Sequence, residues 1–197
     1  LIVLTLVGGF FAVQSGRQRS LLSSQVARIE KRIGTLPISD PRLVHICALE
    51  TENRLEFKWR IYLPANYKMT RFQQSNSSGS SSGGMHTANP TEMIARVHFR
   101  EDNGQIECYS NFGSSSSLEA HQQSMHATML REKVDQLKIE QLGKDGPVTF
   151  EPDEAFTILR ITVPKELLES MKSRFDDLRQ ETLSDEIIRV QFLKQAP

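Results

Sequence analysis

The sequence predicts a mainly β domain of sandwich-like antiparallel sheets, with an α+β arrangement as the alternative. Two observations support this class: runs that alternate between apolar and polar residues, and an Asn-Gly pair between two such runs. An N-terminal helix, transmembrane at its start and coiled-coil further on, and one C-terminal amphipathic helix complete the expected architecture. We therefore expect a β-rich soluble domain over 38–197.

Length and charge narrow the function classes. The chain has 197 residues and 38% hydrophobic content, which suits one domain with appendages. Its 24 Lys and Arg equal its 24 Asp and Glu, so the surplus of cations that nucleic-acid binding needs is missing. Its two cysteines are too few for a disulfide framework or a structural zinc site.

Residues 1–16 are predicted to be a transmembrane anchor of the signal-anchor type. The run 1–13 is almost wholly apolar, and as a helix it spans about 20 Å, short of the roughly 30 Å hydrocarbon core. We therefore expect the visible run to be the rear of a longer span. A cleaved signal peptide or a buried helix is the alternative, although no small-x-small cleavage site follows the run.

Residues 17–37 are predicted to be a helical stalk that forms a short coiled coil. Its apolar residues step by four and three positions, and a membrane tether favours pairing by raising local concentration. The predicted oligomerisation seam comprises Leu22, Val26, Ile29, Ile33 and Leu36. The alternative is a helix that packs the same stripe on its own domain.

The clearest strand is 54–63, where every second residue is apolar, from Leu55 to Leu63. The run 43–49 precedes it across 50–53. A four-residue loop there predicts a hairpin whose apolar faces agree, with Val44 beside Trp59, Ile46 beside Phe57 and Ala48 beside Leu55.

A second hairpin is predicted at Asn103-Gly104, because this dipeptide favours a type I′ turn. The turn sets a register in which Cys108 points inward, whereas Cys47 points outward in the first hairpin, so a disulfide between them is not favoured. The predicted pairs are Phe99–Cys108, Val97–Ser110, Ala95–Phe112 and, on the outer face, Arg100–Glu107.

The remaining segments are predicted as follows. The Ser/Gly-rich stretch 73–89 is expected to be a flexible loop, and 113–117 a shorter flexible tip. Residues 118–142 carry both periodicities, and we favour a hairpin over a helix. Strands are expected at 148–151, 156–163 and 188–192, with an amphipathic helix from Pro164 to about residue 180.

A search for catalytic signatures returns no candidate. His45 and His98 fall on strands among charged residues, where solvated side chains are expected, and His121 and His126 are spaced too unfavourably for a metal pair. The serines lie in low-complexity runs, and the Gly-x-Ser-x-Gly string at 79–83 lacks the strand-to-helix context of a nucleophile elbow. Phosphate-binding glycine motifs are absent from the sequence. No catalytic residue, cofactor or metal is therefore predicted.

A surface is the remaining candidate site. The polar positions of the first hairpin and its exit could display a cationic, partly aromatic face that binds an anionic polymer or a protein. The predicted interaction face comprises Arg54, Lys58, Arg60, Tyr62 and Tyr67. The alternative is an ordinary solvated strand face.

A hydrophobic lead, the helical stretch 28–33 and the run Phe57-Lys58-Trp59-Arg60-Ile61-Tyr62-Leu63-Pro64 together resemble uncharacterised single-pass membrane-anchored proteins of planctomycete-type bacteria. The resemblance covers about the first third of the chain and carries over no activity. It implies export of the domain with a basic N-terminus inside. Arg17 and Arg19 argue for the opposite orientation by the positive-inside rule, so topology stays open.

These observations favour a membrane-anchored, non-enzymatic binding or scaffolding protein of the bacterial envelope, with its soluble domain extracytoplasmic. The expected partners are the lipid bilayer, a second copy or helical partner through the stalk, and an unidentified protein or polymer ligand. The alternative is a membrane-anchored hydrolase or carbohydrate-active enzyme with a dispersed site. A deep pocket with two titratable groups in hydrogen-bond reach would favour that alternative.

Overall fold

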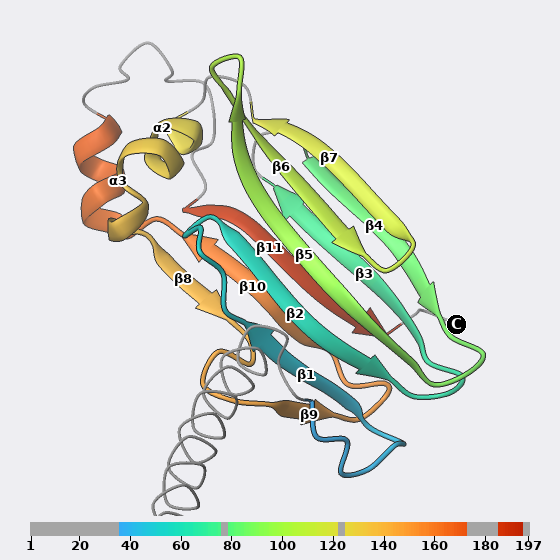
Figure 1. Cartoon of the computed structure of the whole chain (residues 1–197). Helices are drawn as coiled ribbons and strands as arrows, with labels where there is room; N and C mark the ends of the chain where they lie inside the picture. The colour runs from blue at the N-terminus through green and yellow to red at the C-terminus, as the bar shows by residue number, and fades with distance from the viewer. Residues whose placement is uncertain (1–35, 76–78, 122–124, 173–184, 195–197) are drawn as a thin grey trace, which may run out of the picture. The chain divides into compact units, whose positions relative to one another are not determined.

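Alternating strands build two antiparallel sheets whose inner faces share one hydrophobic core (Figure 1). The structure is a computed structural model, and it describes residues 36–75, 79–121, 125–172 and 185–194. The predicted anchor, the stalk and its seam up to Ile33 lie outside the described residues. Leu36 is partly buried in a segment without regular structure.

The first sheet has six strands in the order β7-β6-β5-β2-β1-β9. Each strand pairs antiparallel with its neighbours. Its members are β1 (Val44–Leu49), β2 (Glu56–Leu63), β5 (Thr91–Asp102), β6 (Gln105–Phe112), β7 (Ser115–His121) and β9 (Val148–Phe150).

The second sheet has five strands in the order β4-β3-β11-β10-β8. Consecutive neighbours again pair antiparallel. Its members are β3 (Lys68–Ser75), β4 (Gly79–His86), β8 (Lys138–Gln141), β10 (Phe156–Thr162) and β11 (Glu186–Lys194). The strands predicted at 148–151, 156–163 and 188–192 are thus confirmed. The prediction of antiparallel sheets is confirmed, and the two layers are compatible with a sandwich.

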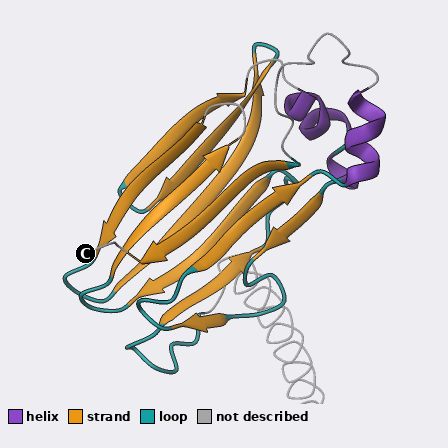
Figure 2. Cartoon of the chain, turned by 180° about the vertical axis from the view of Figure 1, so that it is seen from behind, coloured by secondary structure: helices purple, strands orange, loops and turns teal. Residues whose placement is uncertain are grey.

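Two short helices pack against the core at one end of the sheets (Figure 2). The helix α2 (Met125–Glu132) buries Met129 and Leu130, and a 3₁₀ helix (Val134–Gln136) follows it. The helix α3 (Lys165–Lys172) starts directly after Pro164, as predicted, and buries Met171. Its predicted continuation towards residue 180 lies outside the described residues.

The hairpin at Asn103-Gly104 forms in the predicted register. Asn103 and Gly104 have φ values of 49° and 76°, as a type I′ turn requires. The four predicted cross-strand pairs are all observed. Cys108 is buried in the core, and both cysteines are free.

The first hairpin pairs the predicted strands in a different register. Ala48 lies opposite Trp59 instead of Leu55, a shift of four positions. The connecting loop is longer than predicted because the Thr51 hydroxyl donates to the Glu56 carbonyl oxygen at 2.7 Å, and Asn53 Oδ1 accepts from Leu55 N at 2.9 Å. An even shift keeps every side chain on its face, so the predicted apolar face survives.

The flexible loop predicted over 73–89 is wrong for most of its length. The segment forms the end of β3 and all of β4, and a turn over 113–114 likewise leads directly into β7. On the inner face, Gln73 lies opposite Ser81 and Arg71 opposite Gly83, so small residues of β4 leave room for long polar side chains of β3. Backbone pairing at a sheet edge outweighs the low strand propensity of Ser and Gly.

The hairpin favoured within 118–142 is also wrong. Residues up to 121 belong to β7, but Met125–Glu132 is the helix α2, and β8 follows after the 3₁₀ helix. The buried residues of α2 follow a helical spacing, with Met125, Met129 and Leu130 in the core. The apparent strand alternation at Met125, Ala127 and Met129 is compatible with this stripe because all three are buried.

Candidate functional site

A group of charged side chains covers the outer face of the first sheet. Strands β2 and β5 pair along their full overlap, so the outward residues of both lie side by side. We call the group the outer charge patch. It comprises Glu56, Lys58, Arg60, Glu92, Arg96, Arg100 and Glu107.

Two cations of the patch lie directly opposite each other. Lys58 on β2 lies opposite Arg96 on β5 in the strand register. Like charges at opposed positions repel each other across a sheet, which is unfavourable. One carboxylate lies between them: Glu56 Oε1 is 2.9 Å from Lys58 Nζ and 2.6 Å from Arg96 Nη2. This three-residue cluster therefore holds one more positive charge than negative.

Two carboxylates of the patch, Glu56 and Glu107, lie beneath their cations, whereas Glu92 is more exposed than its partner Arg60. The Glu56 side chain is 11% exposed, whereas those of Lys58 and Arg96 are 33% and 40% exposed. The next pair repeats the arrangement, since Glu107 is more covered than Arg100, which donates to it at 2.7 Å. A partner approaching this face meets ammonium and guanidinium groups first.

The charges of this cluster also shift the pKa values of Glu56 and His98. Burial raises the pKa of Glu56, but the Lys58 bond and the Arg96 charge outweigh it, so the pKa lies below its usual value. Burial and the Arg96 charge lower the pKa of His98, against an opposing effect from Glu56. At neutral pH the Glu56 carboxylate is therefore charged and the His98 ring neutral.

Apolar groups border the patch. Among the described residues, Ile38, Ile94 and Leu118 are the exposed large hydrophobics, and two of them lie on this face. Ile94 is opposite Arg60, and Leu118 is opposite Tyr109 of β6. The face thus joins cations with exposed apolar and aromatic groups, a combination that protein interfaces favour.

The structure brings together only part of the predicted interaction face. Lys58 and Arg60 both stand on the outer face of β2, and Arg60 pairs with Glu92. Arg54 lies in the loop before β2, where it pairs with Asp135. Tyr62 and Tyr67 are buried, at 7% and 1% exposed, so neither forms part of an accessible face.

Each misplaced tyrosine has a physical reason. Tyr62 points outward from β2, but its hydroxyl donates to the Pro41 carbonyl oxygen at 3.1 Å, and its ring meets the His45 ring edge to face. His45, predicted to be solvated, is 1% exposed, with Nε2 2.7 Å from the Asp40 carbonyl oxygen. Tyr67 enters the core, and burial raises the pKa of its hydroxyl.

Sequence reasoning missed Arg96 and Arg100 as site residues. The sequence contained information that could have found them. The register set by Asn103-Gly104 places Arg100 on the outer face, and Arg96, four residues earlier on β5, points to the same face. The sequence did not indicate that β2 pairs with β5, because the hairpin of β3 and β4 separates these two strands in the chain.

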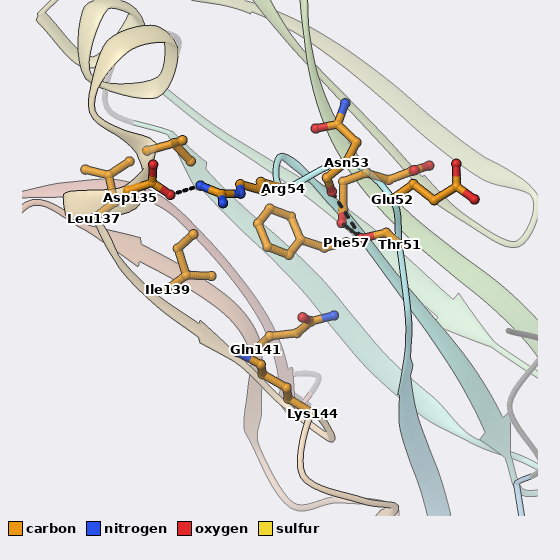
Figure 3. Close-up of a pocket in the computed structure, with 12 residues that line it drawn as sticks. Thr51, Glu52, Asn53, Arg54, Phe57, Asp135, Leu137, Ile139, Gln141 and Lys144 are labelled. Atoms are coloured by element: carbon orange, nitrogen blue, oxygen red, sulfur yellow. Dashed lines mark hydrogen bonds and ion pairs between the residues drawn. The ribbon is translucent and has the colours of Figure 1, made fainter. Parts of the chain in front are cut away.

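A pocket of about 350 Å³ lies between the loop before β2 and the edge strand β8 (Figure 3). Its apolar residues are Phe57, Val134, Leu137 and Ile139, and its charged residues include Arg54 and Asp135, which pair at one end. The other polar lining residues are Thr51, Glu52, Asn53, Glu56, Gln141 and Lys144.

Comparison with protein-family models, curated proteins and solved structures gives no significant match. Across the described ranges, no three His, Cys, Asp or Glu side chains gather as a metal site. Within the same part of the chain, no helix has the length and apolarity to span a bilayer. The function is therefore argued from the outer charge patch and the pocket.

Proposed function

We propose that the chain is a non-enzymatic binding or scaffolding protein of the bacterial envelope, and that the outer charge patch is its binding surface. The observation that carries the proposal is the pairing of Lys58 with Arg96 above a single buried carboxylate. Opposed like charges cost stability, and exposed ion pairs return about 0–1 kcal/mol, so folding alone gives little reason for this arrangement.

The chemistry of the patch defines the partner. Cations that protrude above covered carboxylates attract a carboxylate-rich protein surface or an anionic polymer. The covered acids fix the cations in place, which reduces the side-chain entropy lost on binding. Ile94 adds apolar area beside the charges, so a partner buries both kinds of surface.

The membrane attachment is part of the same proposal. It rests on the apolar run 1–13 and on the seam from Leu22 to Leu36. The anchor would hold the patch near the bilayer, single-pass and extracytoplasmic, and the stalk would pair it with a second copy or a helical partner. Cross-linking of native membranes should show a dimer that Val26→Asp with Ile33→Asp abolishes; unchanged association would remove the stalk from the proposal.

The patch is tested by neutralising it. Lys58→Gln with Arg96→Gln should remove the partner's cross-links to this domain in native membranes, read by mass spectrometry. The matched control is Lys138→Gln with Arg160→Gln, which neutralises an exposed, Glu140-paired cluster on the other sheet. Loss of cross-links in both double variants, or in neither, would contradict the proposal, provided that circular dichroism shows both to be folded.

A further inference from the structure

The pocket in Figure 3 is built from two walls, and hydrogen bonds fix the first wall in place. The Thr51 hydroxyl donates within the loop, to the carbonyl oxygens of Asn53 at 3.1 Å and Glu56 at 2.7 Å. Asn53 Oδ1 accepts from Leu55 N at 2.9 Å. These bonds set the positions of the loop side chains before any ligand arrives.

The second wall is fixed by the turn after β8. Trp59 Nε1 donates to the Leu142 carbonyl oxygen at 2.9 Å, and Ala48 N donates to the Gly143 carbonyl oxygen at 3.1 Å. Gly143 has φ of 76°, and a Cβ on it would lie 3.0 Å from Ala48 N. The turn therefore lies tightly against β1 and β2 and places Lys144 at the pocket.

Of the two cations that line the pocket, Arg54 forms an ion pair and Lys144 does not, among the residues that the structure describes. Arg54 and Asp135 neutralise each other at one end. Lys144 is exposed and forms no ion pair with any residue that the structure describes. Its ammonium group is thus available to one anionic group, and Gln141 also lines the pocket with an amide that can donate (Figure 3).

The acidic residues limit the anion. Glu52, Glu56 and Asp135 all line the pocket, so a doubly charged phosphate would be repelled more strongly than a singly charged carboxylate. The floor of Phe57, Leu137 and Ile139 accepts an apolar group. A volume of about 350 Å³ is at the small end of the range for ligand sites, roughly 300–1,000 Å³.

We propose that this pocket binds a monocarboxylate with a short apolar body, with the carboxylate held by Lys144 and the apolar body on Phe57, Leu137 and Ile139. A free small acid and the C-terminal residue of a polypeptide share this chemistry. The inference goes beyond the binding surface proposed above, because the pocket shares only Glu56 with the outer charge patch and does not depend on it.

The test is a ligand-detected NMR titration of the 197-residue chain in detergent. N-acetyl-leucine is the probe, and N-acetyl-leucinamide is the uncharged match of the same shape. We expect the acid to bind about tenfold more tightly than the amide, which corresponds to about 1.4 kcal/mol. Equal binding of both probes, or no binding of the acid, would overturn the inference.

Two lysine variants locate the carboxylate. Lys144→Gln should weaken binding of the acid about tenfold, to the level of the amide. Lys194→Gln is the matched control, because Lys194 is also exposed but pairs with Asp153 at 3.0 Å, away from the pocket lining. Equal weakening by both, or by neither, would show that Lys144 does not hold the carboxylate.

A further comparison separates the two sources of the carboxylate. An N-acetylated peptide that ends in leucine is titrated beside N-acetyl-leucine. Tighter binding of the peptide assigns the pocket to a polypeptide C-terminus, and equal or weaker binding assigns it to a free acid. Both results require that Lys144→Gln weakens the binding, and a peptide whose affinity is unchanged by that substitution would contradict the inference.

Discussion

The two lateral sides of the domain are closed in different ways. On one side, the short strands β8 and β9 form the edges, and Trp59 and Gly143 bind the connecting turn tightly to the first sheet. On the other side, the long strands β4 and β7 form the edges, with serine and glycine facing inward (Figure 1). The first side is held by steric fit and directed bonds, whereas on the second side a Cβ added to Gly83 would make only ordinary contacts, at 3.7 Å from Arg71 and 3.8 Å from Ser115.

The interior of the β4/β7 side is polar. Arg71 is 3% exposed, donates to Ser110 Oγ at 3.3 Å, and lies over the Phe112 ring at 4.9 Å from its centroid. Beside it, the fully buried Gln73 amide has no hydrogen-bond partner among the described residues. Such a group costs free energy, so the polar interior lowers the stability of this side.

The largest predicted difference between the sides comes from removing a core side chain on each. Trp59→Ala should lower the free energy of unfolding by about 3–5 kcal/mol, because it deletes a fully buried ring and the bond to Leu142. Met85→Ala on β4, which is only partly buried, should cost less than about 2 kcal/mol. Urea unfolding measures both, and equal losses would contradict the distinction between the sides.

A methyl group added to each side gives the next largest effect. Gly143→Ala should cost about 1–3 kcal/mol, because the Cβ meets Ala48 N and φ is positive. Gly83→Ala on the inner face of β4 places its Cβ 3.7 Å from Arg71 Nη2 and 3.8 Å from Ser115 Oγ, ordinary contact distances, and should leave stability unchanged or raise it by about 0.5–1 kcal/mol. A destabilised Gly83→Ala protein would show that the β4 side is also tightly packed.

Replacing the unpaired amide should stabilise the β4/β7 side. Gln73→Met keeps the length of the side chain and removes two buried polar atoms, so we expect a gain of about 1–2 kcal/mol. Gln74→Met, on the exposed face of the same strand, should change the free energy of unfolding by less than about 0.5 kcal/mol. Thermal unfolding compares the two, and a loss in Gln73→Met would mean that the amide has an essential partner.

The smallest effect concerns pH and the outer charge patch. The pKa of His98 is lowered by burial and Arg96, so the unfolded chain binds a proton more readily than the folded one. The contribution of His98 to stability is therefore full above its ordinary pKa of about 6.5 and declines as pH falls below it. His98→Gln should reduce this decline between pH 7.5 and 5.5, whereas His86→Gln, on exposed β4, should retain it. Identical pH profiles for wild type and His98→Gln would contradict the prediction.

The sequence predicted a hairpin correctly where the turn residues alone determine its register. Asn103-Gly104 fixes a register through its positive φ values, and that hairpin formed as expected. The hairpin between β1 and β2 kept its faces but not its register, because the bonds of Thr51 and Asn53 lengthened the loop. Strand β4 was missed because its pairing with β3 outweighs its composition.

The candidate site was less predictable than the fold. The sequence indicated Lys58 and Arg60 because they alternate with core residues on one strand, but their neighbour Arg96 came from a strand paired only in the tertiary structure. The pocket joins the loop at 51–54 with 134–144, and no periodicity relates these segments. Contacts between segments distant in the sequence therefore decide the chemistry of the patch, through strand pairing, and of the pocket, through packing of the two sheets.

Site-specific photo-cross-linking in native membranes tests the central claim most directly. A photoreactive amino acid replaces Ile94, beside the outer charge patch, or Gln191, on the outer face of the other sheet. We predict a discrete adduct from position 94 that Arg96→Gln abolishes, and none from position 191. An adduct from position 191 alone, or one from position 94 that persists in Arg96→Gln, would contradict binding through the patch.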